Sequence, residues 1–152
     1  MAFSLRVLAF AEGETIPVRH TCDGENVSPA MEWSDPPSGT RSYVLVVDDP
    51  DAPAGTWGHW LLWDIPAAVQ SLEEAFRPGQ IGRSGTNDFD ELGYGGPCPP
   101  RGHGPHRYYF RLYALDTSRL GEKEGAKHRA VDKALAGHIL GEACVMGRYE
   151  RQ

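Results

Sequence analysis

Three short stretches contain the polar side chains that could do chemistry. Asp49 and Asp51 lie in DDPDAP, His59 opens HWLLWDIP, and His106 stands beside Arg107 in GHGPHRYYF. An imidazole is partly protonated near neutral pH and can donate to a phosphoryl oxygen. Carboxylates repel a bare phosphate, but they accept hydrogen bonds from a histidine or from an ammonium or hydroxyl group of a ligand. The set therefore predicts a site for a phosphorylated ligand that also carries an amine.

The same side chains leave other chemistry open. His59 or His106 could act as a general acid or base oriented by Asp49, or the Asp and His side chains together could hold a divalent metal. Cys98 could be a nucleophile near His103 or His106. The sequence has no G-x-S-x-G, Walker or H-E-x-x-H motif and no evident nucleophile. We therefore expect a binding protein rather than an enzyme, without catalytic residues, cofactor or bound metal, and a metal-dependent hydrolase is the alternative.

The strands next to these residues must bring them together. RSYVLVVDD, which ends at Asp49, is a β-branched apolar run typical of a central strand buried on both faces. Side chains alternate between the two faces of a strand. In each of the three strands, a polar residue stands at the end of a series of apolar residues on one face. Asp49 follows Tyr43, Leu45 and Val47; His59 precedes Leu61 and Trp63; and His106 precedes Tyr108, Phe110, Leu112 and Ala114. If the three series face one core, Asp49, His59 and His106 converge at its rim.

The loop GGPCPPRGHGPH, residues 95–106, leads into the last of these strands. Proline restricts the backbone and glycine lets the main chain approach a ligand closely, so the loop predicts a stiff wall that offers backbone amides to a small anion. Plainer interpretations remain: DDPDAP as a turn, His59 as a core histidine, Arg107 as an ion-pair residue, and Trp57 as a core aromatic rather than a pocket wall.

The composition predicts a turn-rich, mainly β chain, because 18 of the 152 residues are Gly and 12 are Pro. We expect one domain over residues 1–152, with strands in FSLRVLAF, AMEWSD, RSYVLVVDD, HWLLWDIP, HRYYFRLYAL and EACVMGRYER. The one clear helical pattern is AKHRAVDKALAGHIL, residues 126–140. This order of elements predicts an antiparallel β sandwich with a few peripheral helices, one of them near the C-terminus.

Charge and cysteine content limit the partners. The net charge of −6 and the lack of a basic run argue against nucleic acid, and no segment reaches the roughly 20 apolar residues that span a bilayer. The first residues do not resemble an export signal. Cys22, Cys98 and Cys144 are odd in number and widely spaced, so we expect reduced thiols in a cytoplasmic protein.

Several stretches together resemble the phosphatidylethanolamine-binding protein family, and most closely its bacterial, Raf-kinase-inhibitor-like branch. They are DPDAP (49–53), GHWLLWDIP (58–66), GPCPPRGHGPHRYYFRLYALD (96–116), HTCDGENVSPAMEWSDPP (20–37) and GHILGEACVMGRYER (137–151), in the family's order. The resemblance implies a large antiparallel sheet packed on smaller β structure. It also implies a small rim cavity that binds phosphate-like anions or phospholipid head groups, in a protein with a possible regulatory role.

The resemblance also assigns residues. Asp49 and Asp51 match the aspartates of the D-P-D-x-P signature and Pro53 its last proline, while the other matches are His59, Pro100 and the G-x-H-R-Y element with His106, Arg107 and Tyr108. With Trp57 as a pocket wall, these are the predicted ligand-binding residues. The resemblance further implies a possible homodimer and, as an alternative function, a protein-interaction module like the family's kinase inhibitors, with an unknown protein partner.

Overall fold

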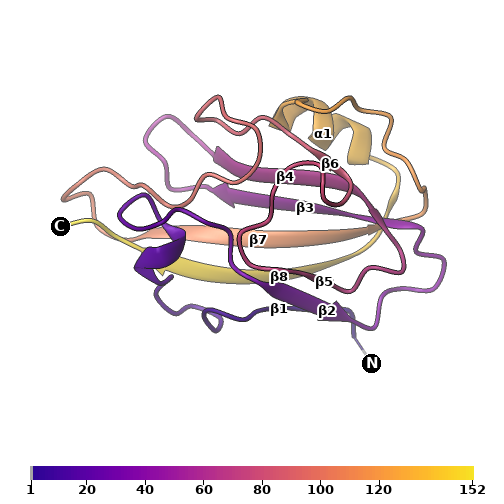
Figure 1. Ribbon diagram of the computed structural model, residues 1–152, viewed down its shortest axis with the longest axis horizontal. Coiled ribbons are helices and arrows are strands. Elements are labelled where there is room, and N and C mark those ends of the chain that lie inside the picture. The colour runs from indigo at the N-terminus through magenta and orange to yellow at the C-terminus, as the bar shows by residue number, and fades with distance from the viewer. Residues whose placement is uncertain (1) are drawn as a thin grey trace.

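The computed structural model describes residues 2–152 as two antiparallel β-sheets (Figure 1). The large sheet has the order β6-β4-β3-β7-β8, and its strands are β6 (Arg83–Ser84), β4 (Trp57–Pro66), β3 (Ser42–Asp49), β7 (His106–Leu115) and β8 (Ile139–Tyr149). The small sheet has the order β1-β2-β5, formed by β1 (Ser4–Val7), β2 (Met31–Ser34) and β5 (Ser71–Leu72). A 3-10 helix, η1 (Val18–His20), and one α-helix, α1 (His128–Leu135), complete the fold. The predicted mainly β architecture is confirmed.

The main core lies between the two sheets. Alternate side chains of β3 and β7 point into it, namely Tyr43, Leu45, Val47, Tyr108, Phe110, Leu112 and Ala114. The small sheet contributes Leu5, Val7, Met31, Trp33 and Leu72. Each fully buried large apolar side chain stabilises the fold by roughly 1.5–3 kcal/mol. The sequence prediction that β3 is a central strand is correct, because all its residues from Ser42 to Asp49 are buried.

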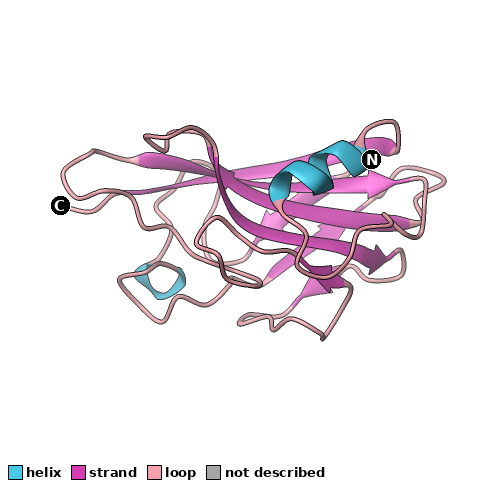
Figure 2. Ribbon diagram, turned by 90° about the horizontal axis from the view of Figure 1, so that it is seen from above, coloured by secondary structure: helices cyan, strands magenta, loops and turns pink. Residues whose placement is uncertain are grey.

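A second, smaller core lies on the other face of the large sheet, under α1. Val131 and Leu135 of the helix pack there with side chains of β3 and β4, including Val44, Leu61 and Trp63, and Figure 2 shows the helix beside the strands. The helix is shorter than the predicted range 126–140. Gly137 adopts a φ of 84°, a left-handed conformation that ends a helix, and the chain then enters β8.

Strand β4 departs from regular pairing at His59. Val47 pairs with Trp60, but Asp48 pairs with Gly58, so His59 is an extra residue on its strand. The alternation argument for His59 is therefore wrong, because Leu61 and Trp63 belong to the second core and not to the main one. A β-bulge of this kind resets the alternation of side chains. It places His59 on the side of Asp49 and His106 after all.

The expectation of reduced thiols is wrong for two of the three cysteines. Cys22 and Cys98 form a disulfide across 76 positions of sequence, and Cys144 is free and exposed. The bond joins the loop after η1 to the Gly/Pro loop, which the odd cysteine count gave no reason to expect. Thiol content therefore no longer supports the cytoplasmic expectation.

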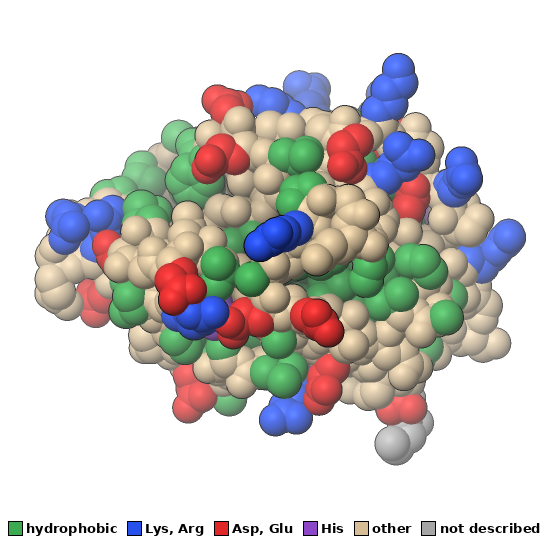
Figure 3. Space-filling model, viewed as in Figure 1, with side chains coloured by type: hydrophobic (Ala, Val, Ile, Leu, Met, Phe, Trp, Pro, Cys, Tyr) green, Lys and Arg blue, Asp and Glu red, His purple; other side chains and the backbone are tan. Residues whose placement is uncertain are grey.

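Over residues 2–152, no helix is long and apolar enough to cross a bilayer. On the face drawn in Figure 3, acidic and basic side chains are interspersed and neither sign forms an extended patch. The electrostatic character of each cavity described below is therefore set by the side chains that line it.

Candidate functional site

A cavity of about 180 Å³ lies at the end of the main core where β3 ends and β4 and β7 begin. We call it the inner cavity, and its lining consists of Asp49, Ala52, Pro53, Trp57, His59, Phe89, Cys98, Pro99, Pro100, His106 and Tyr108. All the predicted site residues except Asp51 and Arg107 are part of this lining. The three polar residues that the strands were expected to bring together, Asp49, His59 and His106, do converge here.

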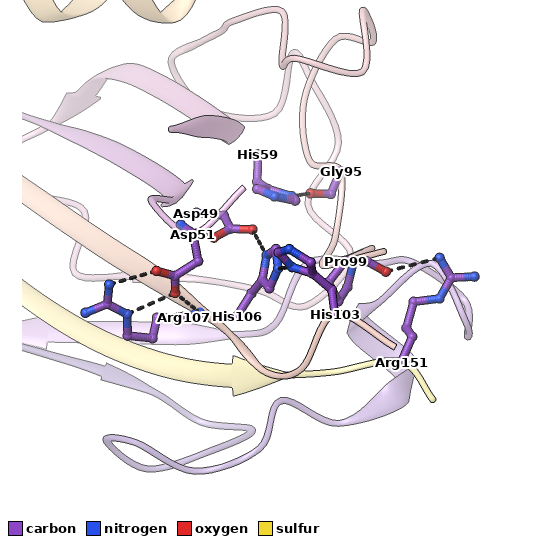
Figure 4. Close-up of polar contacts among 9 residues, drawn as sticks. All are labelled: Asp49, Asp51, His59, Gly95, Pro99, His103, His106, Arg107 and Arg151. Carbon is purple, nitrogen blue, oxygen red and sulfur yellow. Dashed lines mark hydrogen bonds and ion pairs between the residues drawn. The ribbon is translucent and has the colours of Figure 1, made fainter. Parts of the chain in front are cut away.

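A chain of hydrogen bonds runs from a buried carboxylate to the surface (Figure 4). His106 donates from Nδ1 to Asp49 Oδ2 over 2.7 Å, and the side chains of these residues are 2% and 4% exposed. His106 Nε2 lies 2.6 Å from Nδ1 of His103, which is exposed. The other oxygen of Asp49 accepts from the backbone N–H of Asp51 over 2.7 Å. Asp49 therefore orients His106, and both ring nitrogens of His106 are engaged.

His59 is held differently. Its Nδ1 donates to the carbonyl of Gly95 over 2.6 Å, and its ring packs edge-on against Phe89 and Tyr108 with centroids 5.3 and 5.2 Å away. Burial lowers the pKa of His59, although the Gly95 carbonyl opposes this. The imidazole is therefore neutral near pH 7, with its proton on Nδ1. Among residues 2–152, Nε2 makes no hydrogen bond, so it is an acceptor available to a ligand.

Two donors of the lining lack partners. The Tyr108 hydroxyl and Trp57 Nε1 are buried and make no hydrogen bond within residues 2–152. Burial and the nearby negative charge of Asp49 raise the pKa of Tyr108, so its hydroxyl keeps its proton. A buried polar group without a partner costs roughly 1–3 kcal/mol, and such groups at a cavity point to an occupant that satisfies them. Composition and strand pattern could not reveal these orphan donors, because they depend on what surrounds each ring.

Asp51 and Arg107 do not line the inner cavity. Arg107 donates to Asp51 from Nη2 over 2.8 Å and from Nε over 2.9 Å, and its backbone N–H adds a third bond. This guanidinium lowers the pKa of Asp51 to about 2. Arg107 lies on the face opposite to His106, as alternation predicted, and the pair borders a second cavity on the outer side.

The Gly/Pro loop forms a wall of the inner cavity, and several of its backbone amides are bound within the protein. Gly95 N–H bonds the His59 carbonyl, Gly96 N–H bonds Asn26 Oδ1, and Gly102 N–H bonds the Arg151 carbonyl. Of the loop residues in the lining, Pro99 and Pro100 have no N–H at all. The amides of Gly95, Gly96 and Gly102 therefore hold the loop itself in place and do not face an anion.

Packing explains why the loop needs its glycines. A Cβ on Gly96 would lie 2.1 Å from the His20 carbonyl oxygen and 2.5 Å from Asn26 Oδ1. Only glycine fits such an approach. The disulfide to Cys22 and the contact of Arg151 Nη1 with Cys98 Sγ at 3.3 Å hold the same wall.

The sequence analysis missed some of the lining. Phe89 closes one side, edge-on to Trp57 with centroids 5.5 Å apart, yet it lies in a loop without any motif. Phe89 is also 38% exposed, so hydrophobic pattern alone does not distinguish it from a surface residue.

The hydrolytic alternatives find no support in this geometry. Within residues 2–152, no group of three or more His, Cys, Asp and Glu side chains is arranged to hold a metal ion. Cys98 is disulfide-bonded and has no thiolate to offer as a nucleophile.

The fold and the inner cavity define a class of protein, a two-sheet β protein with a small, largely apolar pocket at one end of its core. A family model described as phosphatidylethanolamine-binding protein matches residues 7–150. This chain belongs to that family, and the resemblance seen in its motifs is confirmed.

Relatives and solved structures agree with this assignment. A UPF0098 protein of Aquifex aeolicus is 49% identical over 146 residues, covering 94% of this chain and 85% of that protein. The crystal structure of Escherichia coli YbcL is similar with a TM-score of 0.94 at 32% identity, covering 100% of both chains. That of the phosphatidylethanolamine-binding protein homologue CT736 of Chlamydia trachomatis has a TM-score of 0.90 at 39% identity, covering 99% of each.

Proposed function

We propose that this protein binds a small phosphorylated head group that also carries an amine, in the inner cavity and without chemical turnover. The observation that carries the proposal is the set of unmatched polar groups around this cavity. Tyr108 and Trp57 offer two donors, and His59 Nε2 offers an acceptor. Both oxygens of Asp49 already accept one hydrogen bond each, but a carboxylate has further lone pairs and can accept from an ammonium group as well. Phosphoryl oxygens match the donors, and an ammonium group matches the acceptors.

A bare phosphate fits this cavity less well. No Lys or Arg side chain belongs to its lining, whereas the carboxylate of Asp49 does. Placing an anion beside a buried carboxylate is unfavourable unless a cation accompanies it. A ligand with both charges brings its own counter-charge, and aromatic faces such as that of Trp57 also attract an ammonium group.

A binding role agrees with the chemistry of the lining. The most polar contact of the lining, between Asp49 and His106, is held in place by hydrogen bonds with Asp51 and His103, as suits a fixed wall of a binding site. The family description and the names of the relatives state no catalytic activity. Binding is therefore the proposed function. Occupancy of the cavity by the ligand would then regulate a partner of this protein.

Calorimetric titration with O-phosphoethanolamine tests the proposal. We expect saturable binding to the wild-type protein, about tenfold weaker binding to His59→Gln and Tyr108→Phe, and unchanged binding to His138→Gln. His138 pairs with Asp116 on the surface, where both side chains are about half exposed, so it controls for loss of an imidazole. If O-phosphoethanolamine does not bind, or binds the folded His59→Gln and Tyr108→Phe variants as tightly as the wild type, the proposal is wrong.

A further inference from the structure

A larger cavity of about 390 Å³ adjoins the inner one on the outer side of His106. We call it the outer cavity, and it is lined by Asp51, His103, Pro105, His106, Arg107 and Arg148. His106 belongs to the linings of both cavities. The two spaces are therefore neighbours, separated by the hydrogen-bonded pair of His106 and His103.

The outer cavity has an excess of positive charge. Arg107 and Arg148 are direct cross-strand partners on β7 and β8, and like charges in that position repel each other. Asp51 neutralises Arg107. Among residues 2–152, no carboxylate forms an ion pair with Arg148. Arg148 is thus a cation without a counter-ion, placed beside a second guanidinium.

The backbone of Arg148 is fixed on both sides. On one side it pairs with β7, and on the other its N–H donates to the Glu14 carbonyl over 2.9 Å while its carbonyl accepts from Ile16 N–H over 2.8 Å. A side chain on a backbone held in this way loses less freedom when it binds than one on a mobile loop. The guanidinium also presents a planar fork that matches carboxylate and phosphate oxygens.

We infer that the outer cavity is an anion subsite, and that it takes a second anionic group of the ligand whose amine and phosphate occupy the inner cavity. This inference rests on the proposed function. The inference narrows the expected class of ligand to head groups of the phosphoserine type, which carry a carboxylate in addition to an amine and a phosphate. His103, which lines the outer cavity and hydrogen-bonds His106, is exposed and flanked by Gly102 and Gly104, where an added Cβ would meet no atom within 4 Å.

A matched pair of probes tests this inference. O-phospho-L-serine differs from O-phosphoethanolamine by one carboxylate, so the ratio of their dissociation constants isolates the second anionic group. We expect the wild-type protein to bind O-phospho-L-serine about tenfold more tightly, as a charge-assisted hydrogen bond would produce. Arg148→Gln should bind the two probes equally, and Arg148→Lys should retain part of the preference. Arg129→Gln, an exposed arginine on α1, is the control and should keep the full ratio.

Equal affinities for the two probes in the wild type, or a ratio that survives Arg148→Gln, would overturn the inference while leaving the head-group proposal intact. If neither probe binds, the proposal that the inner cavity binds a head group is wrong. The anion subsite is then tested separately, by titration with inorganic phosphate. In that case phosphate must move the NMR signal of the Arg148 Nε–H in a saturable way, and Arg129 must not respond. An unmoved Arg148 signal would overturn the anion subsite as well.

Discussion

Asp49 and His106 form a buried hydrogen bond that joins neighbouring strands β3 and β7. Their side chains are 4% and 2% exposed, the least of any Asp–His or Glu–His pair within residues 2–152. The contact fixes which nitrogen of His106 carries the shared proton and which one faces His103. It is therefore both a structural contact and the element that sets the hydrogen-bonding pattern at the wall between the two cavities.

Loss of this pair should cost far more stability than loss of a surface pair. For Asp49→Ala we expect a decrease of about 3 kcal/mol in the free energy of unfolding, because the buried His106 loses its partner. Asp116→Ala removes the carboxylate paired with His138, where both groups are about half exposed, and should cost less than about 1 kcal/mol. Urea unfolding at pH 7 measures both. Similar losses of stability in the two variants would contradict the expected contribution of Asp49 to the free energy of unfolding.

The Tyr108 hydroxyl should contribute little to the stability of the unliganded protein. It is buried without a partner, so Tyr108→Phe is expected to be neutral or to stabilise by up to about 1 kcal/mol. Tyr94 provides the contrast, because its hydroxyl donates to the His20 carbonyl over 2.6 Å, and Tyr94→Phe should cost about 1–2 kcal/mol. Thermal and urea unfolding of both variants check this difference, and a destabilised Tyr108→Phe would show that the hydroxyl has a partner.

Asp51 should titrate at unusually low pH. Arg107 lowers the pKa of this carboxyl to about 2, so the stability it contributes is present above the unfolded value of about 4 and is lost as the pH falls towards 2. Carboxyl-carbon NMR of Arg107→Gln should find the Asp51 pKa shifted up towards about 4. An unchanged value in the variant would mean that another group lowers it.

His59 should weaken the fold in mild acid. Burial lowers its pKa, whereas an unfolded histidine binds its proton near pH ~6.5. Below that pH the unfolded state holds more protons than the folded state, so the free energy of unfolding decreases as the pH falls. His59→Gln should flatten this dependence between pH 7.5 and 5, and His138→Gln should not. Parallel stability curves for wild type and His59→Gln would rule the effect out.

The disulfide makes a simple prediction about thiols. Without reductant, the denatured chain should show a single reactive thiol, that of Cys144, and with reductant it should show three. The bond spans 76 positions, so replacing Cys22 and Cys98 together by Ser should cost about 4 kcal/mol, as loop closure in the unfolded chain predicts. Cys144→Ser is the control. Three reactive thiols in the unreduced denatured protein would exclude the bond.

Strand pattern predicted the fold well, because its signals are local. RSYVLVVDD and HRYYFRLYAL have apolar side chains on the faces that the core demands, and β3 and β7 follow them closely. The convergence of Asp49 and His106 follows from the same alternation. The Gly/Pro loop and the DPDAP stretch also lie where their motifs indicated, at the end of the core.

The remaining features depend on pairing, which no local pattern encodes. The bulge at His59 arises from the register of β4 against β3, and the alternation rule fails at that residue for this reason. Cys22 and Cys98 meet only in three dimensions, as do Phe89 and Trp57. The separation of Asp51 from the inner cavity likewise depends on a contact between distant parts of the chain, its ion pair with Arg107.

The arrangement of the inner cavity also has a consequence for the order of folding. Its wall unites the loop containing Cys22, the end of β3, the bulged start of β4 and the Gly/Pro loop, and Arg151 beyond β8 supports it. Contacts this far apart in sequence form late, since the entropy of closing long loops must first be overcome. We therefore expect the pocket to be among the last features to assemble during folding, so that ligand binding reports a chain that has reached its native state.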